Sequence, residues 1–221
     1  MAYTTVDKAK ANMSATKFSG TGSSNSITGV NFQPDCVWIK ARFATTDWVA
    51  FNSLRGTTKK LIINETNIEA TDANSLTAFG TDGFTLGSEA AVNTNGNDYI
   101  AYCWHNVPGL QKFGTYSGNS NADGPFIELG FRPALFVMKQ TDSTGYWMVY
   151  DSARDPINDG SPYYLFWNDD SAQGTGYDLD FLSNGVKLRT DNANFNTTSY
   201  VYAAWAEAPS IDLYGGGANA R

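Results

Sequence analysis

The sequence predicts an all-β protein built from two tandem β-sandwich repeats of jelly-roll type. Its 221 residues include 21 Gly, 12 Tyr, 13 Phe and 6 Trp. Glycine is typical of tight turns, and aromatic side chains favour the pleated, half-buried faces of strands. No long stretch keeps a helical periodicity, and the chain aligns with itself over most of its length. These features predict many short strands arranged in two similar domains.

The internal repeat is carried by anchors that recur in the same order in both halves. They pair Pro34 with Pro133, Lys40 with Lys139, Trp48 with Trp147, Arg55 with Arg154, Tyr99 with Tyr200 and Trp104 with Trp205. A weaker match pairs Lys17 and Phe18 with Lys112 and Phe113. We expect an N-terminal arm over residues 1–16, a first repeat over 17–109, a second over 110–209 and a flexible C-terminal tail over 210–221.

Each repeat contains the same local strand signals. Thr-Asp-Gly at 81–83 and Ser-Asn-Gly at 183–185 each precede a short strand pattern, which is typical of a β-hairpin. The segments 99–104 and 200–205 are apolar almost throughout, as expected of a central strand that is buried on both faces.

The overall charge argues against several classes of partner. The net charge is −7 and the sequence pI is about 4.6, whereas a nucleic-acid-binding protein needs a basic stripe. The apolar run 134–138 is too short to cross a bilayer, and the N-terminus has no apolar secretory segment. Two cysteines make no disulfide framework. We expect assembly in a reducing cytoplasm, with no nucleic acid, membrane insertion or cofactor.

Residues that both repeats keep are expected to serve the fold. This set comprises Lys40, Trp48, Arg55, Lys139, Trp147 and Arg154. A Trp next to an Arg can also form a ligand platform. We favour the scaffold interpretation, in which the arginine stabilises a turn through Asn52 or Asp151 and the tryptophan packs in the core.

Metal binding and nucleophilic catalysis find little support. Cys36, Cys103 and His105 have the apolar residues Leu135, Ala204 and Ala206 as their counterparts in the second repeat. A structural zinc site also needs four ligands. His105 is the only histidine, and no Gly-x-Ser-x-Gly motif accompanies it. We therefore expect no metal site and no enzymatic activity.

Two further hypotheses come from carboxylates in the second repeat. Asp169, Asp170, Asp178 and Asp180 fall in one short stretch. A pair of them could support glycoside hydrolysis, and the group could form a weak calcium site. A solvated loop is the simpler interpretation.

The main difference between the repeats is aromatic. The second repeat has Tyr146, Tyr163, Tyr164, Phe166, Trp167 and Tyr177, and the first has Leu61, Ile62 and Ile63 near the place of 164–167. Exposed Tyr and Trp on a β scaffold can contact a glycan or a receptor protein. The same rings could instead pack between the repeats or in a subunit interface.

Several segments resemble a family of virion structural proteins from marine tailed phages. The segment 32–42, Phe-Gln-Pro-Asp-Cys-Val-Trp-Ile-Lys-Ala-Arg, resembles the family's F-x-P-D-x-V-W-I-K-x-R motif. Segment 52–56 resembles D-S-x-R-G with Asn52 in place of Asp, and segment 75–87 resembles L-x-x-F-x-x-D-G-F-x-L-G. Segment 98–104 resembles Y-V-A-W-x-W, and the opening residues 2–8 look like the start of that family.

The resemblance implies a virion protein associated with the tail or tail fibre, with a role in attachment to the host surface. It implies other virion proteins as partners, a homo-oligomer with a trimer as the form expected of a fibre component, and a host-surface glycan as a possible ligand. The alternatives are a capsid decoration protein, a carbohydrate-binding module and a polysaccharide depolymerase.

Overall fold

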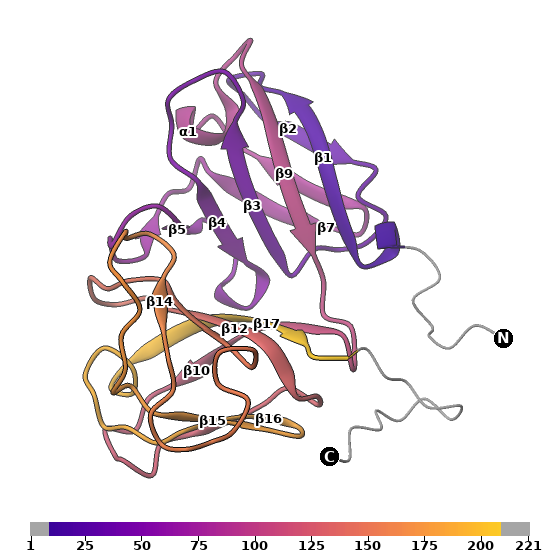
Figure 1. The fold of residues 1–221 in the computed structure, drawn as a ribbon. Helices are drawn as coiled ribbons and strands as arrows, with labels where there is room; N and C mark the ends of the chain where they lie inside the picture. Colours follow the sequence, from indigo (N-terminus) through magenta and orange to yellow (C-terminus); the bar gives the residue numbers. More distant parts are fainter. Residues whose placement is uncertain (1–8, 209–221) are drawn as a thin grey trace, which may run out of the picture. The chain divides into compact units, whose positions relative to one another are not determined.

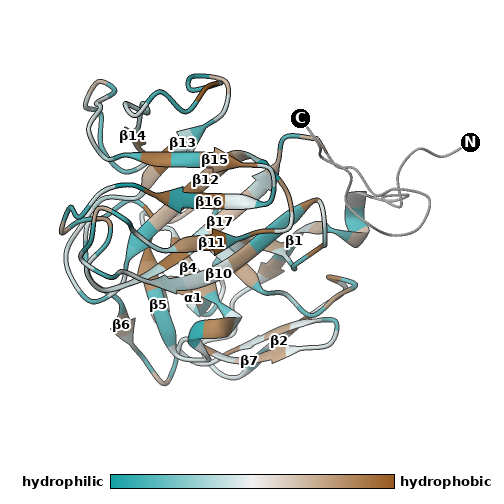
Figure 2. Ribbon diagram, turned by 90° about the horizontal axis from the view of Figure 1, so that it is seen from below, coloured by the Kyte–Doolittle hydropathy of each residue, from teal (hydrophilic) through white to brown (hydrophobic). Residues whose placement is uncertain are grey.

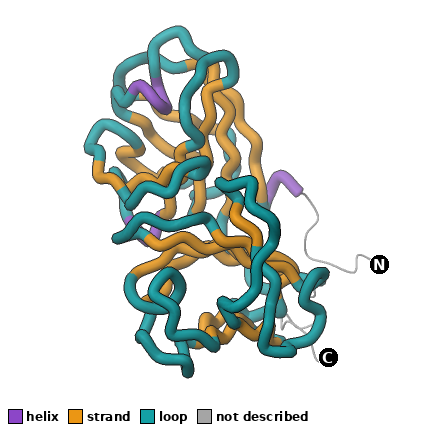
Figure 3. Tube along the Cα trace, turned by 60° about the vertical axis from the view of Figure 1, so that its left-hand side comes forward, coloured by secondary structure: helices purple, strands orange, loops and turns teal. Residues whose placement is uncertain are grey.

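The computed structural model describes residues 9–208, and the expected tail over 210–221 and residues 1–8 of the expected arm lie outside that range. The chain forms two compact units that divide between His105 and Asn106. We call the described residues 9–105 the N-terminal unit and 106–208 the C-terminal unit. Strands dominate both units, and helix is confined to short segments (Figure 3). None of the helices in the described residues is long and apolar enough to span a membrane.

The N-terminal unit is a β-sandwich. Its larger sheet has the order β1-β9-β3-β4-β5-β6, and its smaller sheet has the order β2-β8-β7 (Figure 1). The strands of the larger sheet are β1 (Met13–Ser19), β3 (Cys36–Ala41), β4 (Val49–Asn52), β5 (Lys59–Ile62), β6 (Ala70–Thr71) and β9 (Asp98–Trp104). Those of the smaller sheet are β2 (Asn25–Thr28), β7 (Leu76–Gly80) and β8 (Gly83–Leu86). The unit also has the helical turns η1 (Ala9–Ala11), η2 (Ser53–Arg55) and α1 (Ala90–Asn93).

The C-terminal unit repeats this plan. Its larger sheet has the order β10-β17-β12-β13-β14 and its smaller sheet the order β11-β16-β15. The larger sheet contains β10 (Gln111–Ser117), β12 (Pro133–Gln140), β13 (Met148–Asp151), β14 (Leu165–Phe166) and β17 (Ser199–Ala206). The smaller sheet contains β11 (Phe126–Glu128), β15 (Leu179–Leu182) and β16 (Gly185–Leu188). The prediction of an all-β chain with two β-sandwich repeats is confirmed.

Each core lies between the two sheets of its own unit. In the N-terminal unit, Val37, Ile39 and Tyr99 of the larger sheet pack with Phe84 and Leu86 of the smaller one. In the C-terminal unit the core includes Phe136, Met138, Tyr150, Phe181 and Val186. Alternation produces this arrangement, since side chains along a strand point to opposite faces. On β15, for example, buried Leu179 and Phe181 flank the more exposed Asp180, and the colours alternate accordingly (Figure 2).

Two of the expected positions need correction. β1 begins at Met13, so residues 13–16 belong to a sheet and not to an arm, because their backbone pairs with β9. The match of Phe18 with Phe113 is also wrong. Phe18 pairs with Tyr99, and Tyr116 pairs with the equivalent Tyr200, so the counterpart of Phe18 is Tyr116.

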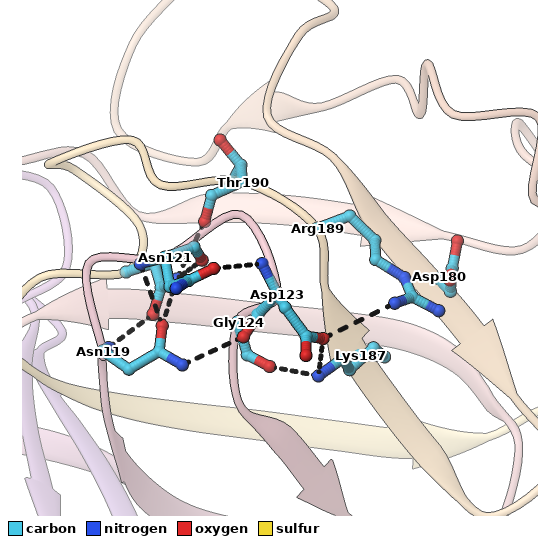
Figure 4. A network of polar contacts seen from close by, with 9 residues as sticks. Asn119, Asn121, Asp123, Gly124, Asp180, Lys187, Arg189 and Thr190 are labelled. Atoms are coloured by element: carbon cyan, nitrogen blue, oxygen red, sulfur yellow. Dashed lines mark hydrogen bonds and ion pairs between the residues drawn. The ribbon is translucent and has the colours of Figure 1, made fainter.

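A fully buried asparagine joins the same two loops in both units. Asn196 receives a hydrogen bond on Oδ1 from the Asn119 backbone at 2.8 Å. Its Nδ2 donates to the Asn121 and Thr190 carbonyls at 2.7 and 2.8 Å. The loop residues Asn119, Asn121 and Thr190 come together in Figure 4. Asn93 makes the matching bonds to the Thr21 backbone, the Ser23 carbonyl and the Gly87 carbonyl, at 2.9, 2.6 and 2.6 Å. The loops around this pair differ in length between the units, so the spacing of the sequence repeat does not align the two asparagines.

A buried tyrosine supports the neighbouring turn in the same way in each unit. The Tyr99 hydroxyl receives a hydrogen bond from the Thr94 backbone and donates to the Ala90 carbonyl. Tyr200 makes the same two bonds with Thr197 and Ala193. These shared bonds explain why both repeats keep the tyrosine.

Candidate functional site: the aromatic edge of the C-terminal unit

The scaffold arginines differ between the repeats, since Arg154 pairs with Asp151 as expected and Arg55 does not pair with Asn52. Arg154 donates from Nε to the Asp151 carboxylate at 2.7 Å. In the N-terminal unit Asn52 stands at the place of Asp151, and its side chain caps η2 by accepting from the Leu54 backbone. Arg55 therefore pairs with a different carboxylate, Glu69, through two hydrogen bonds of 2.8 Å each.

The two tryptophans also hold equivalent positions. The backbone N–H of Trp48 donates to Asn64 Oδ1 at 2.8 Å, and that of Trp147 donates to Asn168 Oδ1 at 2.9 Å. Trp147 is buried, whereas Trp48 is half-buried and stacks near Tyr102. Because Asn64 and Asn168 are equivalent, they align β5 of one unit with β14 of the other. Ile63 is therefore the counterpart of Trp167.

The two lysines differ in environment although both lie at the same place in their sheets. Lys139 is fully buried and donates to the Gln140 carbonyl at 2.7 Å. Burial lowers the pKa of Lys139 to about 8, against the opposing effect of Asp142. Lys40 is half-buried and reaches the Ala41 carbonyl at 3.5 Å.

The residues that suggested a metal site do not converge. Cys103 lies in the N-terminal core, where burial raises its pKa to about 12. Cys36 is buried on the neighbouring strand, where it pairs with Trp104, and His105 Nε2 lies 2.8 Å from the Ala11 carbonyl. Within residues 9–208, no three His, Cys, Asp or Glu side chains are grouped so that they could hold a metal ion.

The carboxylates of the second repeat lie in different local environments. Asp180 is ion-paired with Arg189 at 2.7 Å, and Asp169 accepts a hydrogen bond from the Ser171 hydroxyl. Asp178 has a buried Oδ1 without a hydrogen-bond partner. Burial and the nearby Asp180 raise the pKa of Asp178.

The predicted aromatic residues gather around β14, the edge strand of the larger sheet in the C-terminal unit. Tyr163, Leu165 and Trp167 are 41%, 38% and 44% exposed, and the intervening Tyr164 and Phe166 pack against the core. This alternation is the period of a strand. The predicted group therefore divides into an outward row and an inward row.

The inward row is a continuous series of ring contacts. Tyr146 stacks on Phe166 with 4.1 Å between centroids, and Phe166 lies 5.2 Å from Tyr164. Tyr164 stacks on Tyr177 at 4.7 Å, and Tyr177 lies 5.6 Å from the buried Phe195. Tyr164 and Tyr177 therefore pack against the core of their own unit, and not between the repeats or in a subunit interface as expected. Tyr146, at the outer end of the row, is 42% exposed.

A glycine on the next segment makes room for the inward row. Gly174 and Tyr164 exchange two backbone hydrogen bonds of 3.0 and 3.1 Å. A Cβ on Gly174 would lie 2.4 Å from the Tyr164 hydroxyl oxygen, so the tyrosine ring covers the glycine. Gly174 carries no signal of this role in the sequence, because only its pairing with Tyr164 shows what it does.

The outward row has no equivalent in the N-terminal unit. β4 pairs Val49 with Ile62, and β13 pairs Met148 with Phe166, so Leu61 and Ile63 take the places of Leu165 and Trp167. Leu61 and Ile63 are only 5% and 7% exposed. We call Tyr163, Leu165 and Trp167 the aromatic edge. At this edge the two copies of the repeat differ in the exposure of equivalent side chains.

A comparison with protein-family models places this chain. The model of a domain of unknown function, DUF7483, matches residues 8–97 and again residues 88–209. The first match lies within the N-terminal unit up to residue 97, and the second begins at residue 88 and extends over the C-terminal unit, so that the two together support the internal repeat. Searches of curated proteins and of solved structures returned no match. The chain belongs to the DUF7483 family, whose model matches it twice.

Proposed function

We propose that this protein is a structural component of a tailed-phage virion, associated with the tail or tail fibre, and that its C-terminal unit contacts the host surface. One observation carries the contact role. Tyr163, Leu165 and Trp167 are about two-fifths exposed in one copy of the domain. In the other copy, Leu61 and Ile63, the counterparts of Leu165 and Trp167, are buried.

The duplication supports a binding role for this edge. Both copies keep the same strand order, the buried asparagine and the tyrosine-supported turn. These shared features are the ones that the fold needs. Exposed Trp and Tyr are common among the residues that dominate binding energy at protein interfaces. A row of large apolar side chains on the surface is typical of interaction sites.

The virion role is supported by the motif resemblance in segments 32–42, 52–56, 75–87 and 98–104. It is tested by immunogold labelling of intact particles with antibody against this chain. Label on the tail or its tip is the expected result. Label over the head would contradict the tail assignment and favour a capsid decoration protein, and particles without label would contradict the virion role altogether.

The contact role is tested by competition, in which purified protein is added to host cells before the phage. We expect the wild-type protein to slow adsorption and Trp167→Ala to lose this effect. Phe43→Ala is the matched control, because Phe43 is an exposed aromatic residue of the N-terminal unit, 78% accessible. Equal inhibition by wild type and Trp167→Ala would contradict a contact role for the aromatic edge.

As a tail or fibre component the protein would act as a homo-oligomer, with a trimer as the expected form. Analytical ultracentrifugation of the purified chain measures this directly. A strictly monomeric chain at the concentrations reached in a particle would argue against the fibre assignment.

A further inference from the structure

The aromatic edge lies in an acidic part of the chain. Residues 155–186 contain no Lys or Arg. They contain six aspartates, at positions 155, 159, 169, 170, 178 and 180. This stretch includes β14, β15 and the loops that flank them. The segment that carries the edge therefore has acidic side chains and no basic ones of its own.

Five of these carboxylates form no ion pair with another described residue, and three of the five, Asp159, Asp169 and Asp170, lie nearest to the aromatic edge in the sequence. Asp180 is already paired with Arg189. Asp159 and Asp170 are exposed and Asp169 is half-buried. Asp159 precedes Tyr163 along the chain, and Asp169 and Asp170 follow Trp167, so negative charge flanks the aromatic edge at both ends.

The equivalent edge of the N-terminal unit supplies its own cations. By the register of the two strands, Lys59 and Lys60 of β5 stand where Tyr163 and Tyr164 stand in the other unit. Lys60 is ion-paired with Asp72 at 3.2 Å and with Glu89, and Lys59 lies 3.9 Å from Glu69. The C-terminal unit thus has tyrosines where the N-terminal unit has two ion-paired lysines.

This combination is complementary to one kind of ligand group. The faces of Trp and Tyr attract Lys and Arg side chains through cation–π interactions, with Arg the more frequent partner. Carboxylates form charge-assisted hydrogen bonds with the same groups. We propose that the aromatic edge binds a cationic, Lys- or Arg-bearing segment of a partner protein.

The proposal deepens the proposed function and rests on the aromatic edge being a contact surface. Electrostatics disfavours the other occupants. A second copy of this chain carries the same net charge of −7, and a phosphate- or sulfate-bearing polymer would be repelled as well. A neutral polysaccharide would leave the three carboxylates without charge partners, although it could still contact the rings.

The test measures binding of a fluorescently labelled octa-arginine peptide to the full chain by anisotropy, at low and at high salt. Octa-glutamate and neutral maltohexaose serve as the alternative probes. We expect octa-arginine to bind, and its affinity to fall as the salt concentration increases. Trp167→Ala should weaken binding of the peptide about tenfold. The double variant Asp169→Asn/Asp170→Asn should weaken binding and also reduce its dependence on salt.

The N-terminal unit provides a matched control for charge. Glu65 follows Asn64 as Asp169 follows Asn168, and its carboxylate is exposed. Glu65→Gln removes one negative charge at the equivalent place, beside buried Ile63 in place of Trp167. It should leave octa-arginine binding unchanged, whereas Asp169→Asn alone should weaken it.

Three outcomes would overturn the proposal. The first is that octa-arginine shows no binding at low salt, and the second is that Glu65→Gln and Asp169→Asn lose the same amount of affinity for it. The third outcome is that binding of maltohexaose depends on Trp167 and binding of octa-arginine does not. The last outcome would identify a glycan site. If the peptide fails but Trp167→Ala still abolishes competition for adsorption, the contact role stands and only the cationic partner is wrong.

Discussion

Asn196 holds in the C-terminal unit the place that Asn93 holds in the N-terminal unit, and each is fully buried with its amide bonded to two loops. The two residues belong to copies with few identical positions in these loops. Their retention follows from backbone groups that would otherwise be buried without partners, which costs about 1–3 kcal/mol for each such group.

Replacing either asparagine with alanine should destabilise its own unit. We expect Asn196→Ala and Asn93→Ala each to lower the free energy of unfolding by about 3 kcal/mol, because several hydrogen bonds are lost together. Urea denaturation followed by tryptophan fluorescence measures the loss. Asn194→Ala, in an exposed position of the same turn, is the control and should change stability by less than about 0.5 kcal/mol. Similar losses for Asn194→Ala and Asn196→Ala would show that the amide network is unimportant.

The division of the aromatic group into two rows predicts opposite effects for neighbouring tyrosines. Tyr164→Ala removes a ring that stacks on Tyr177 and covers Gly174, and it should cost about 3 kcal/mol. Tyr163→Ala removes a ring of the outward row and should change stability by less than about 0.5 kcal/mol. Thermal unfolding followed by circular dichroism compares the two. A larger loss for Tyr163→Ala would mean that the inward and outward rows are reversed.

Buried Lys139 makes stability depend on pH. Its pKa is about 8 in the folded chain and 10.5 as the reference value, so the unfolded state binds more protons between these values. Stability from this group is therefore lowest below pH 8 and rises as pH increases toward 10.5, by up to about 3 kcal/mol. The useful window ends near pH 10, where tyrosines of the unfolded chain begin to ionise.

Lys139→Met tests this dependence, because methionine is of similar length and buries no charge. We expect the variant to be more stable than wild type at pH 7 and its advantage to shrink between pH 8 and 10, measured by urea denaturation at each pH. Lys40→Met is the matched control, since Lys40 is half-buried, and it should show no such trend. An advantage for Lys139→Met that stays constant across this range would argue against a depressed pKa.

The two scaffold arginines should differ in their contribution to stability. Arg55 holds Glu69, whose side chain is 7% exposed, whereas Arg154 holds Asp151, whose side chain is 25% exposed. Removing the cation leaves a more deeply buried carboxylate in the first case, which is the more costly change. Arg55→Ala should lose about 3 kcal/mol and Arg154→Ala about 1 kcal/mol in urea denaturation. The restoring double variant Arg55→Ala/Glu69→Leu should recover part of the loss, and its failure to do so would exclude the buried charge as the cause.

Part of the candidate site could be predicted from the sequence. The excess of aromatic residues between 146 and 177 was visible once the two repeats were aligned, and so was the apolar character of Leu61, Ile62 and Ile63 in the other copy. The sequence alone left open whether these rings pack or bind. Exposure decides this residue by residue, and it depends on the orientation of β14 in its sheet.

The repeat alignment succeeded where anchors are large and failed where loops differ in length. Trp48 and Trp147 aligned because the segments before them have equal length in both copies. The pair Asn64 and Asn168 was missed because residues inserted after Arg154 change the spacing. Phe18 was matched to Phe113 when Tyr116 is its counterpart, since a short segment can be aligned at several positions and only the pairing with β9 and β17 fixes one.

The fold class and the duplication can be predicted from the amino-acid sequence, because turn residues, strand patterning and recurrent anchors are local properties of the chain. Reading them requires no knowledge of tertiary contacts. Tertiary structure alone decided which aromatic rings face outward, which lysine is buried and which carboxylate each arginine holds. Those properties depend on the register between strands and on loop length. A shift of one residue in register turns a side chain from the core to the surface.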